Sequence, residues 1–239
     1  KAVTVQHADG RTEEVRAEEL LVATGRRPNL DGLNLEATGV ALERRGVRVD
    51  DALRTSVPGL WACGDITGVS LYTHVATYQA DIVVDNILAA PETPRRADYR
   101  LVPRVTFTDP EVAAVGLTEP QARERARALG AEVQVSRFPF YGIPRGTIDL
   151  EEEGLVKVVA VRGTGELLGV HIVGARAGEL VHEAIAAMAG GLSADRLAEQ
   201  MHAFPTLSEA VRFAAAGVEV ERAVRVGCVL CVREERAAA

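Results

Sequence analysis

Hydrophobic and polar residues alternate along residues 1–24, and the turn-forming sequence Ala8–Gly10 separates two short runs. A period of two is typical of strands, so this segment predicts two strands joined at a tight turn. The apolar runs Glu19–Ala23 and Leu60–Cys63 each stop at or just before a glycine, and we expect both to be buried strands. Apolar positions at helical spacing predict a long helix over Thr73–Ala89.

The second half of the chain separates its strand-like and helix-like segments. Residues 90–96 are polar and proline-rich, which predicts a domain boundary there. Beyond it, segregated strand and helix patterns indicate an α+β domain with an antiparallel sheet. Strands are expected at Pro103–Thr108, Ala113–Leu117, Glu132–Phe138, Leu155–Arg162 and Leu167–Val173, and helices at Glu119–Leu129 (with Thr118 as N-cap), Ala177–Ala189, Ala194–Gln200 and Leu207–Ala216.

Composition narrows the possible functions. The 239 residues are 47% hydrophobic, so the chain can bury a core, and no apolar run is long enough to cross a bilayer. A net charge of −7 disfavours nucleic acid and anionic lipid as partners. Three cysteines do not form a disulfide scaffold, which favours the cytoplasm. The chain opens without Met inside a strand-like pattern, so we expect it to be part of a longer protein.

Two segments end a predicted strand at a glycine. Ala23–Asn29 (ATGRRPN) contains Gly25 and Arg26, and taken alone it is also a common structural turn. Thr55–Asp65 (TSVPGLWACGD) contains Gly64, where the missing side chain lets a ligand approach the backbone. Asp65 would stand at the carboxyl end of a strand, where open α/β sheets bind ligands. An ordinary helix N-cap is the alternative role for Asp65.

The third segment, Leu71–Ala76 (LYTHVA), opens the predicted long helix. A helix N-terminus presents unpaired N–H groups and a partial positive charge, which favours a negatively charged ligand. The candidate contact residues are Thr73, His74, Val75 and Ala76.

Together these segments resemble class I pyridine nucleotide–disulfide oxidoreductases, whose dimerisation domain opens with a sequence similar to Val105–Glu119. The resemblance covers residues 1 to about 216. It implies an α/β remnant of a two-dinucleotide-binding flavoprotein followed by an α+β dimerisation domain. The implied parts are the end of an NAD(P)-binding domain (1–24), part of an FAD-binding and central domain (25–96), a dimerisation domain (97–216) and a tail (217–239).

The resemblance also implies cofactors and partners. FAD would contact Gly25, Arg26, Gly64, Asp65 and the turn at Thr73–Ala76, NAD(P)H would donate electrons, and the enzyme would be a homodimer. The version THVATYQA at the start of the long helix is most similar to the mercuric-reductase-like branch, with the dihydrolipoyl-dehydrogenase-like branch as second choice. The glycine motifs and the reactive disulfide of the family are absent from this sequence, so the chain alone is not expected to transfer a hydride.

A fourth segment departs from the family pattern. Met201–Ala210 (MHAFPTLSEA) is similar to the family sequence H-x-H-P-T-x-x-E, in which the histidine before Pro-Thr is the acid–base of the active-site thiols and the glutamate holds it. Phe204 stands at that histidine position and cannot transfer a proton. Glu209 is retained, and His202 would have to reach from another direction to replace the missing group. We therefore expect that this enzyme does not protonate a dithiol leaving group.

The tail carries the pair Cys228-x-x-Cys231. Thiolates select soft metal ions, so the pair is a candidate relay for Hg²⁺; a redox pair, half a zinc site and chance burial remain open. The leading hypothesis is an FAD-dependent enzyme that reduces Hg(II) to Hg(0). The alternatives are dihydrolipoyl dehydrogenase or another disulfide reductase, a flavoprotein with a different small acceptor, and a non-catalytic dimerisation module.

Overall fold

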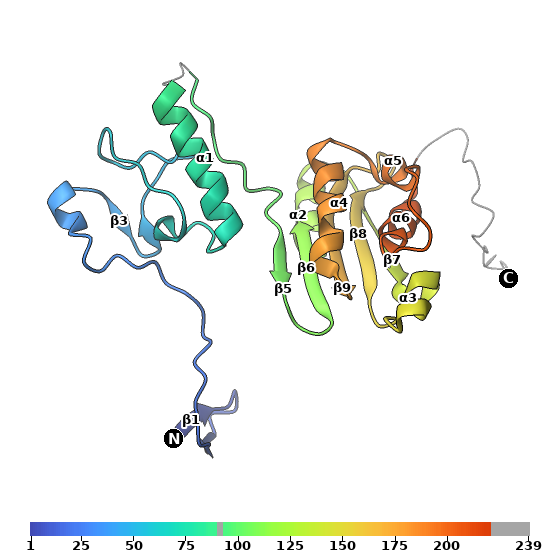
Figure 1. Cartoon of the computed structure of the whole chain (residues 1–239), viewed down its shortest axis with the longest axis horizontal. Helices are drawn as coiled ribbons and strands as arrows, with labels where there is room; N and C mark the ends of the chain where they lie inside the picture. Colours follow the sequence, from blue (N-terminus) through green and yellow to red (C-terminus); the bar gives the residue numbers. More distant parts are fainter. Residues whose placement is uncertain (90–92, 221–239) are drawn as a thin grey trace. The chain divides into compact units, whose positions relative to one another are not determined.

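The computed structural model describes residues 1–89 and 93–220, and the chain divides into two compact units, Lys1–Asp98 and the residues from Tyr99 onward (Figure 1). In the first unit, β1 (Ala2–Gln6) and β2 (Thr12–Arg16) pair antiparallel, as the alternation predicted. The Gly10 N–H donates to the His7 carbonyl at 2.9 Å and closes the turn between them.

The prediction of a buried strand at Glu19–Ala23 is wrong for this structure. The segment has no strand partner among the described residues, and the Leu21 side chain is 89% exposed. A strand exists only where neighbours accept and donate its backbone hydrogen bonds, and none of the described residues provides them. The predicted strand at Leu60–Cys63 is also wrong: its residues are half-buried, and Trp61 forms an isolated bridge to Arg54.

The rest of the first unit is organised around α1 (Thr73–Ala89), whose predicted bounds are confirmed. Small elements precede α1 along the chain: η1 (Leu35–Thr38), β3 (Leu42–Glu43), β4 (Gly46–Val47) and η2 (Asp65–Thr67). Apolar side chains from these segments and from α1 are buried, namely Val40, Val47, Ala52, Leu53, Val75 and Ile82.

One buried amide joins three segments of this unit. The Asn86 side chain on α1 donates to the carbonyls of Ala52 (3.3 Å) and Arg95 (2.9 Å), and its Oδ1 accepts from the Arg95 N–H at 2.8 Å. Because a buried amide must be hydrogen-bonded, Asn86 fixes the loop before η2 and the chain after α1 to the same helix.

The second unit is an α+β fold, as predicted. Five antiparallel strands lie in the order β5-β6-β9-β8-β7. Their bounds are β5 (Arg104–Thr106), β6 (Glu111–Gly116), β7 (Val133–Pro139), β8 (Leu155–Val161) and β9 (Leu167–Gly174). The helices are α2 (Glu119–Ala128), α4 (Ala177–Ala189), α5 (Ala194–Ala198) and α6 (Glu209–Ala216), together with the short η3 (Phe140–Gly142) and α3 (Pro144–Asp149), which the sequence pattern did not predict.

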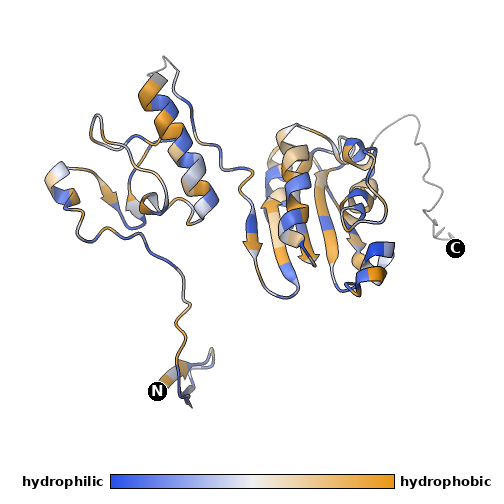
Figure 2. Cartoon of the chain, viewed as in Figure 1, coloured by the Kyte–Doolittle hydropathy of each residue, from blue (hydrophilic) through white to orange (hydrophobic). Residues whose placement is uncertain are grey.

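The two faces of this sheet bury different helices. Val156 and Val158 of β8 belong to the core that contains residues of α4 and α6, whereas Val159 packs with Ala122 and Ala126 of α2. Ala160 follows the same alternation and lies on the first face, at a register shift in the pairing of β8 with β9. Figure 2 shows hydrophobic residues along β6, β8 and β9 between these helical layers.

A cluster of charges ties α2 to the sheet. The Glu119 carboxylate, at the start of α2, accepts from Lys157 Nζ at 2.8 Å and from the Arg123 guanidinium at 2.7 Å, and Arg137 lies 3.4 Å away. Hydrogen bonds from Lys157 and Arg123 lower the pKa of Glu119 from 4.5 to about 2. The Glu119 side chain is only 22% exposed, so solvent screens these contacts incompletely.

We predict that Glu119→Gln destabilises the second unit by about 2 kcal/mol at pH 7, because the neutral amide loses these cation contacts. Since the folded pKa lies below the ordinary value, the stabilisation is complete above pH 4.5 and disappears as the pH falls towards 2. Hydrogen exchange of the β8 and β9 amides measures the effect across this range. Glu124→Gln, on the same helix and without a described ion pair, is the control; equal exchange in both variants would contradict the prediction.

Candidate functional site

The turn at Gly64 is held to α1 by a buried side chain. The Gly64 N–H donates to Oε1 of Gln79 at 2.5 Å, and Gln79 is fully buried. Gly64 has φ 81°, which favours glycine, and a Cβ added there would lie 3.3 Å from the Cβ of Ala76. The turn therefore packs against the first turns of α1, and a larger residue at position 64 would strain this contact.

Asp65 follows immediately as the first residue of η2. Its side chain is exposed, and it forms no hydrogen bond or ion pair with residues 1–89 or 93–220. The N-cap position of η2 is Gly64, and no side chain caps the helix. The Asp65 carboxylate is thus a hydrogen-bond acceptor that the described protein leaves available to a ligand.

The N-terminus of α1 is partly occupied by its own turn. The N–H groups of Val75 and Ala76 both donate to the Tyr72 carbonyl at 3.0 Å, and Val75 is buried. The Tyr72 ring stacks on the His74 ring, with centroids 5.1 Å apart. Thr73 and His74 are exposed. Of the four residues predicted for this turn, Thr73 and His74 are therefore the ones that face solvent.

Gly25 and Arg26, the first pair of predicted ligand residues, are not joined to this turn. Both are exposed, and neither forms a hydrogen bond or ion pair with Gly64 or Asp65 in the described part of the chain. The structure consequently brings together Gly64 and α1, but not the exit turn at Gly25.

The second unit holds the segment that carries Phe204. The Phe204 side chain is 72% exposed, whereas Glu209, at the start of α6, is buried. Oε2 of Glu209 accepts from the Thr206 N–H at 3.2 Å, and Thr206 Oγ1 donates to the Ala203 carbonyl at 2.7 Å. Glu209 thus fixes the backbone beside Phe204 rather than a histidine ring.

His202 is bound to a different carboxylate. Its Nε2 lies 2.5 Å from Oε1 of Glu183 on α4, and its Nδ1 lies 3.0 Å from the Gln200 carbonyl. The His202 side chain is only 7% exposed. The structure therefore pairs His202 with Glu183 and not with Glu209.

Among the described residues, the other titratable and thiol groups do not add a site. The pKa of His171 is lowered by burial, and its Nε2 contacts the Leu117 carbonyl at 3.0 Å on the sheet. Cys63 is half-buried. Residues 1–89 and 93–220 contain no group of three or more His, Cys, Asp or Glu residues that could hold a metal ion, and Cys228 and Cys231 lie outside the described residues. No helix among the described residues is long and apolar enough to span a membrane.

Sequence reasoning missed two residues of these sites. Gln79 lies one helical turn beyond Ala76, so its position on α1 could be predicted from the sequence. Its hydrogen bond to Gly64 could not, because it depends on how the Gly64 turn packs against the helix. Glu183 is 19 residues from His202, and no local pattern joins them.

Comparison with known proteins places these features in a class. Residues 1–80 match the family model described as pyridine nucleotide-disulphide oxidoreductase, and residues 102–215 match the dimerisation domain of the same enzymes. Both matches are to one family of oxidoreductases, and the second is to its dimerisation domain. The chain belongs to the pyridine nucleotide-disulphide oxidoreductase family.

Two branches of the family are equally similar in sequence. The chain is 40% identical over 209 residues to dihydrolipoyl dehydrogenase of Corynebacterium glutamicum, covering 87% of this chain and 44% of that enzyme. It is 41% identical over 213 residues to mercuric reductase of Streptomyces lividans, covering 89% and 44%. The chain thus spans less than half the length of these curated relatives.

Solved structures show the same fold. The HOCl-induced flavoprotein disulfide reductase RclA from Escherichia coli is 31% identical with a TM-score of 0.79, covering 91% of this chain and 48% of RclA. LpdA from Mycobacterium tuberculosis is 30% identical with a TM-score of 0.76, covering 89% and 45%.

The family is FAD-dependent and takes electrons from NAD(P)H. The residues of the first unit fit such a flavin. The Asp65 carboxylate is a hydrogen-bond acceptor without a described partner, and it could bind the hydroxyl groups of the sugar-alcohol chain of FAD. The exposed N-terminus of α1, with Thr73 and His74, offers a site of positive potential. FAD bound there would supply the redox chemistry, and these residues would orient it.

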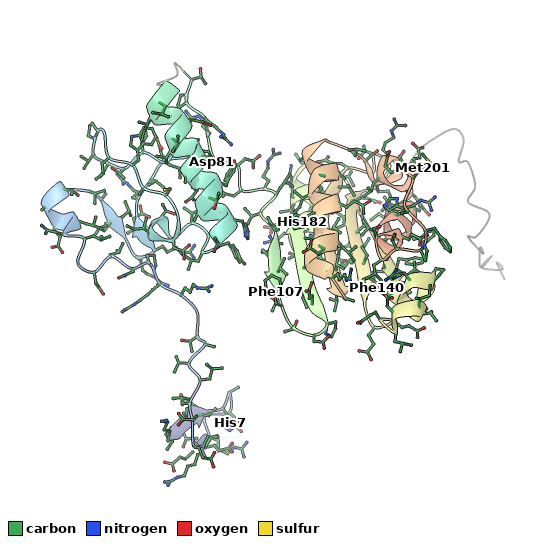
Figure 3. All side chains as sticks on the ribbon, in the orientation of Figure 1. His7, Asp81, Phe107, Phe140, His182 and Met201 are labelled. Carbon is green, nitrogen blue, oxygen red and sulfur yellow. The ribbon has the colours of Figure 1, made fainter. Side chains whose placement is uncertain are left out.

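We predict that Asp65→Asn in the full-length protein weakens FAD binding about tenfold or more, because a charge-assisted acceptor is lost. Flavin absorbance per polypeptide after gel filtration, and titration of flavin fluorescence, measure the loss. Asp81→Asn, an exposed carboxylate further along α1 that Figure 3 labels, is the control and should retain flavin. Full flavin retention by Asp65→Asn would remove Asp65 from the cofactor site.

Proposed function

We propose that this chain is the C-terminal half of a homodimeric, FAD-dependent NAD(P)H oxidoreductase that reduces Hg²⁺ to Hg⁰. In this proposal residues 1–24 end the NAD(P)-binding domain, 25–96 complete the FAD-binding and central domain, 97–216 form the dimerisation domain and 217–239 the tail. The observation that carries the proposal is Phe204, an exposed side chain without an ionisable proton at the family's acid–base position.

Proton balance separates the possible acceptors. Reducing a disulfide to two thiols consumes two electrons and two protons, whereas reducing Hg²⁺ to Hg⁰ consumes two electrons and no proton at the metal. Phe204 cannot donate a proton, and Glu209 is engaged with the Thr206 N–H. A segment with phenylalanine at the family's acid–base position is therefore suited to a metal-ion acceptor.

Two further observations support a soft metal ion. The 41% identity to a mercuric reductase extends over most of this chain. Cys228 and Cys231, in the tail, supply two thiols, and thiolates prefer soft cations. Their proposed role is to accept Hg²⁺ from solution thiols and pass it to the reactive cysteines of the upstream half.

Dihydrolipoyl dehydrogenase is the second candidate. It is favoured by the 40% identity to such an enzyme and by the retained, buried Glu209. It requires a group that protonates and deprotonates the dithiol, and Phe204 lacks that capacity. A non-catalytic dimerisation module is the remaining alternative, and it predicts a full-length protein without flavin.

We predict that the full-length enzyme oxidises NADPH with thiol-bound Hg²⁺ at least about tenfold faster than with lipoamide, and that Phe204→His raises the lipoamide rate about 10²-fold by restoring an acid–base. Anaerobic turnover followed at the NADPH absorbance band measures both. Phe107→His, at another exposed phenylalanine of the second unit, is the control. Efficient lipoamide turnover by the unaltered enzyme would favour dihydrolipoyl dehydrogenase, and a colourless protein would favour the non-catalytic module.

We also predict that replacing both Cys228 and Cys231 by Ala slows Hg²⁺-dependent NADPH oxidation when mercury is supplied as a dithiol complex, because the relay between solution thiols and the active site is lost. Turnover at limiting mercury complex measures the effect. Cys63→Ala, at the half-buried thiol of the first unit, is the control. Unchanged turnover in the double variant would leave the tail cysteines without this role.

A further inference from the structure

The segment Met201–Thr206, between α5 and α6, has apolar side chains that the single chain leaves exposed. Met201 is fully exposed and Phe204 is 72% exposed (Met201 is labelled in Figure 3). Burial of apolar surface stabilises a segment, and these two side chains are not buried within the chain. They therefore do not fix the position of the segment. Its position has to come from polar contacts with the helices around it.

Two carboxylates from two different helices provide those contacts. Glu209 of α6 accepts from the Thr206 N–H, at the end of the segment. Glu183 of α4 binds the His202 ring, between Met201 and Phe204. In the described part of the chain, no other hydrogen bond joins this segment to α4.

The position of Glu183 is itself rigid. Val181 and Ala184, its neighbours on α4, are fully buried in the core between this helix and the sheet. Both ring nitrogens of His202 lie within hydrogen-bond distance of an oxygen: Nε2 of the Glu183 carboxylate and Nδ1 of the Gln200 carbonyl. Because the His202 side chain is only 7% exposed, its contact with Glu183 is largely shielded from water.

We propose that the His202–Glu183 contact is a positioning device, which anchors the segment to α4 and sets the position of Phe204 relative to the electron acceptor. The acceptor part of this inference rests on the proposed function. With both nitrogens engaged and the ring buried, His202 has no atom left to exchange a proton with substrate. It acts by holding the neighbouring residues in place, and it is not a catalytic residue.

The test uses the full-length, FAD-loaded protein. Glu183→Ala removes the anchor, and Glu183→Gln keeps an oxygen that accepts from the His202 ring. Glu179→Ala, an exposed carboxylate one turn earlier on α4, is the control. We expect amide hydrogen exchange at residues 202–206 to rise about tenfold in Glu183→Ala, with a smaller rise in Glu183→Gln and none in the control.

Kinetics distinguish positioning from general stability. We expect Glu183→Ala to lower kcat with the reducible acceptor about tenfold, with partial rescue by Glu183→Gln, while the KM for NAD(P)H is unchanged. Reduction of ferricyanide, a one-electron outer-sphere oxidant, is the reference reaction and should keep its rate. Should Glu183→Ala not fold, His202→Ala removes the same contact from the other side.

Each outcome decides one of the two claims. If the unaltered enzyme does not reduce Hg²⁺, the proposed function fails. The positioning role is then still tested by the exchange measurement and by kinetics with whichever acceptor the enzyme reduces. Unchanged exchange at 202–206 in Glu183→Ala would overturn the positioning role. Faster exchange with an unchanged kcat would also overturn it, because the pair would then contribute to structure alone.

Discussion

The Gly64 N–H needs a partner once the turn that contains it is buried, and Gln79 provides it. This 2.5 Å bond decides where η2 begins relative to α1. A side chain larger than hydrogen would press on Ala76, and the positive φ would strain the backbone. Asp65, the next residue, therefore projects from a turn that is fixed on one side by α1, and this fixed direction makes an exposed carboxylate useful as a ligand group.

The second unit applies the same principle to the Phe204 segment. Its sheet and helices supply a rigid frame, in which α4 and α6 are buried against the strands. Two carboxylates at the edge of that frame, Glu183 and Glu209, each bind part of an otherwise solvent-exposed segment. The sequence resemblance implied an acid–base histidine before Pro-Thr, held by Glu209. In this chain the corresponding residue is Phe204, so the frame is kept while the proton-transfer group is absent. The proposed reaction with a metal ion is consistent with that combination, because electrons alone have to reach the acceptor.

Local patterns predicted much of the fold. Period-two alternation identified the β1–β2 hairpin, strand-like runs identified the five strands of the large sheet, and the bounds of α1 and α4 agree with the helical periodicity. The predictions failed where an element depends on distant partners. The runs Glu19–Ala23 and Leu60–Cys63 are apolar enough for buried strands, but strand formation requires hydrogen-bonded neighbours, and the described residues do not supply them. The short α3 was missed because six residues carry too little periodicity to be recognised.

The sequence by itself determined the residue types at the candidate sites: a glycine and a carboxylate in TSVPGLWACGD, and a phenylalanine before Pro-Thr. Those identities fix which groups can accept a hydrogen bond or transfer a proton, because that capacity belongs to the side chain. Only the tertiary structure decided which groups meet. It placed Gln79 on Gly64, Glu183 on His202 and Glu209 on the Thr206 N–H. From the sequence alone, Glu183 and Glu209 could each have bound either His202 or the Thr206 N–H. The packing of α4 and α6 against the sheet determines which carboxylate binds which partner, because it brings only these pairs within hydrogen-bond distance.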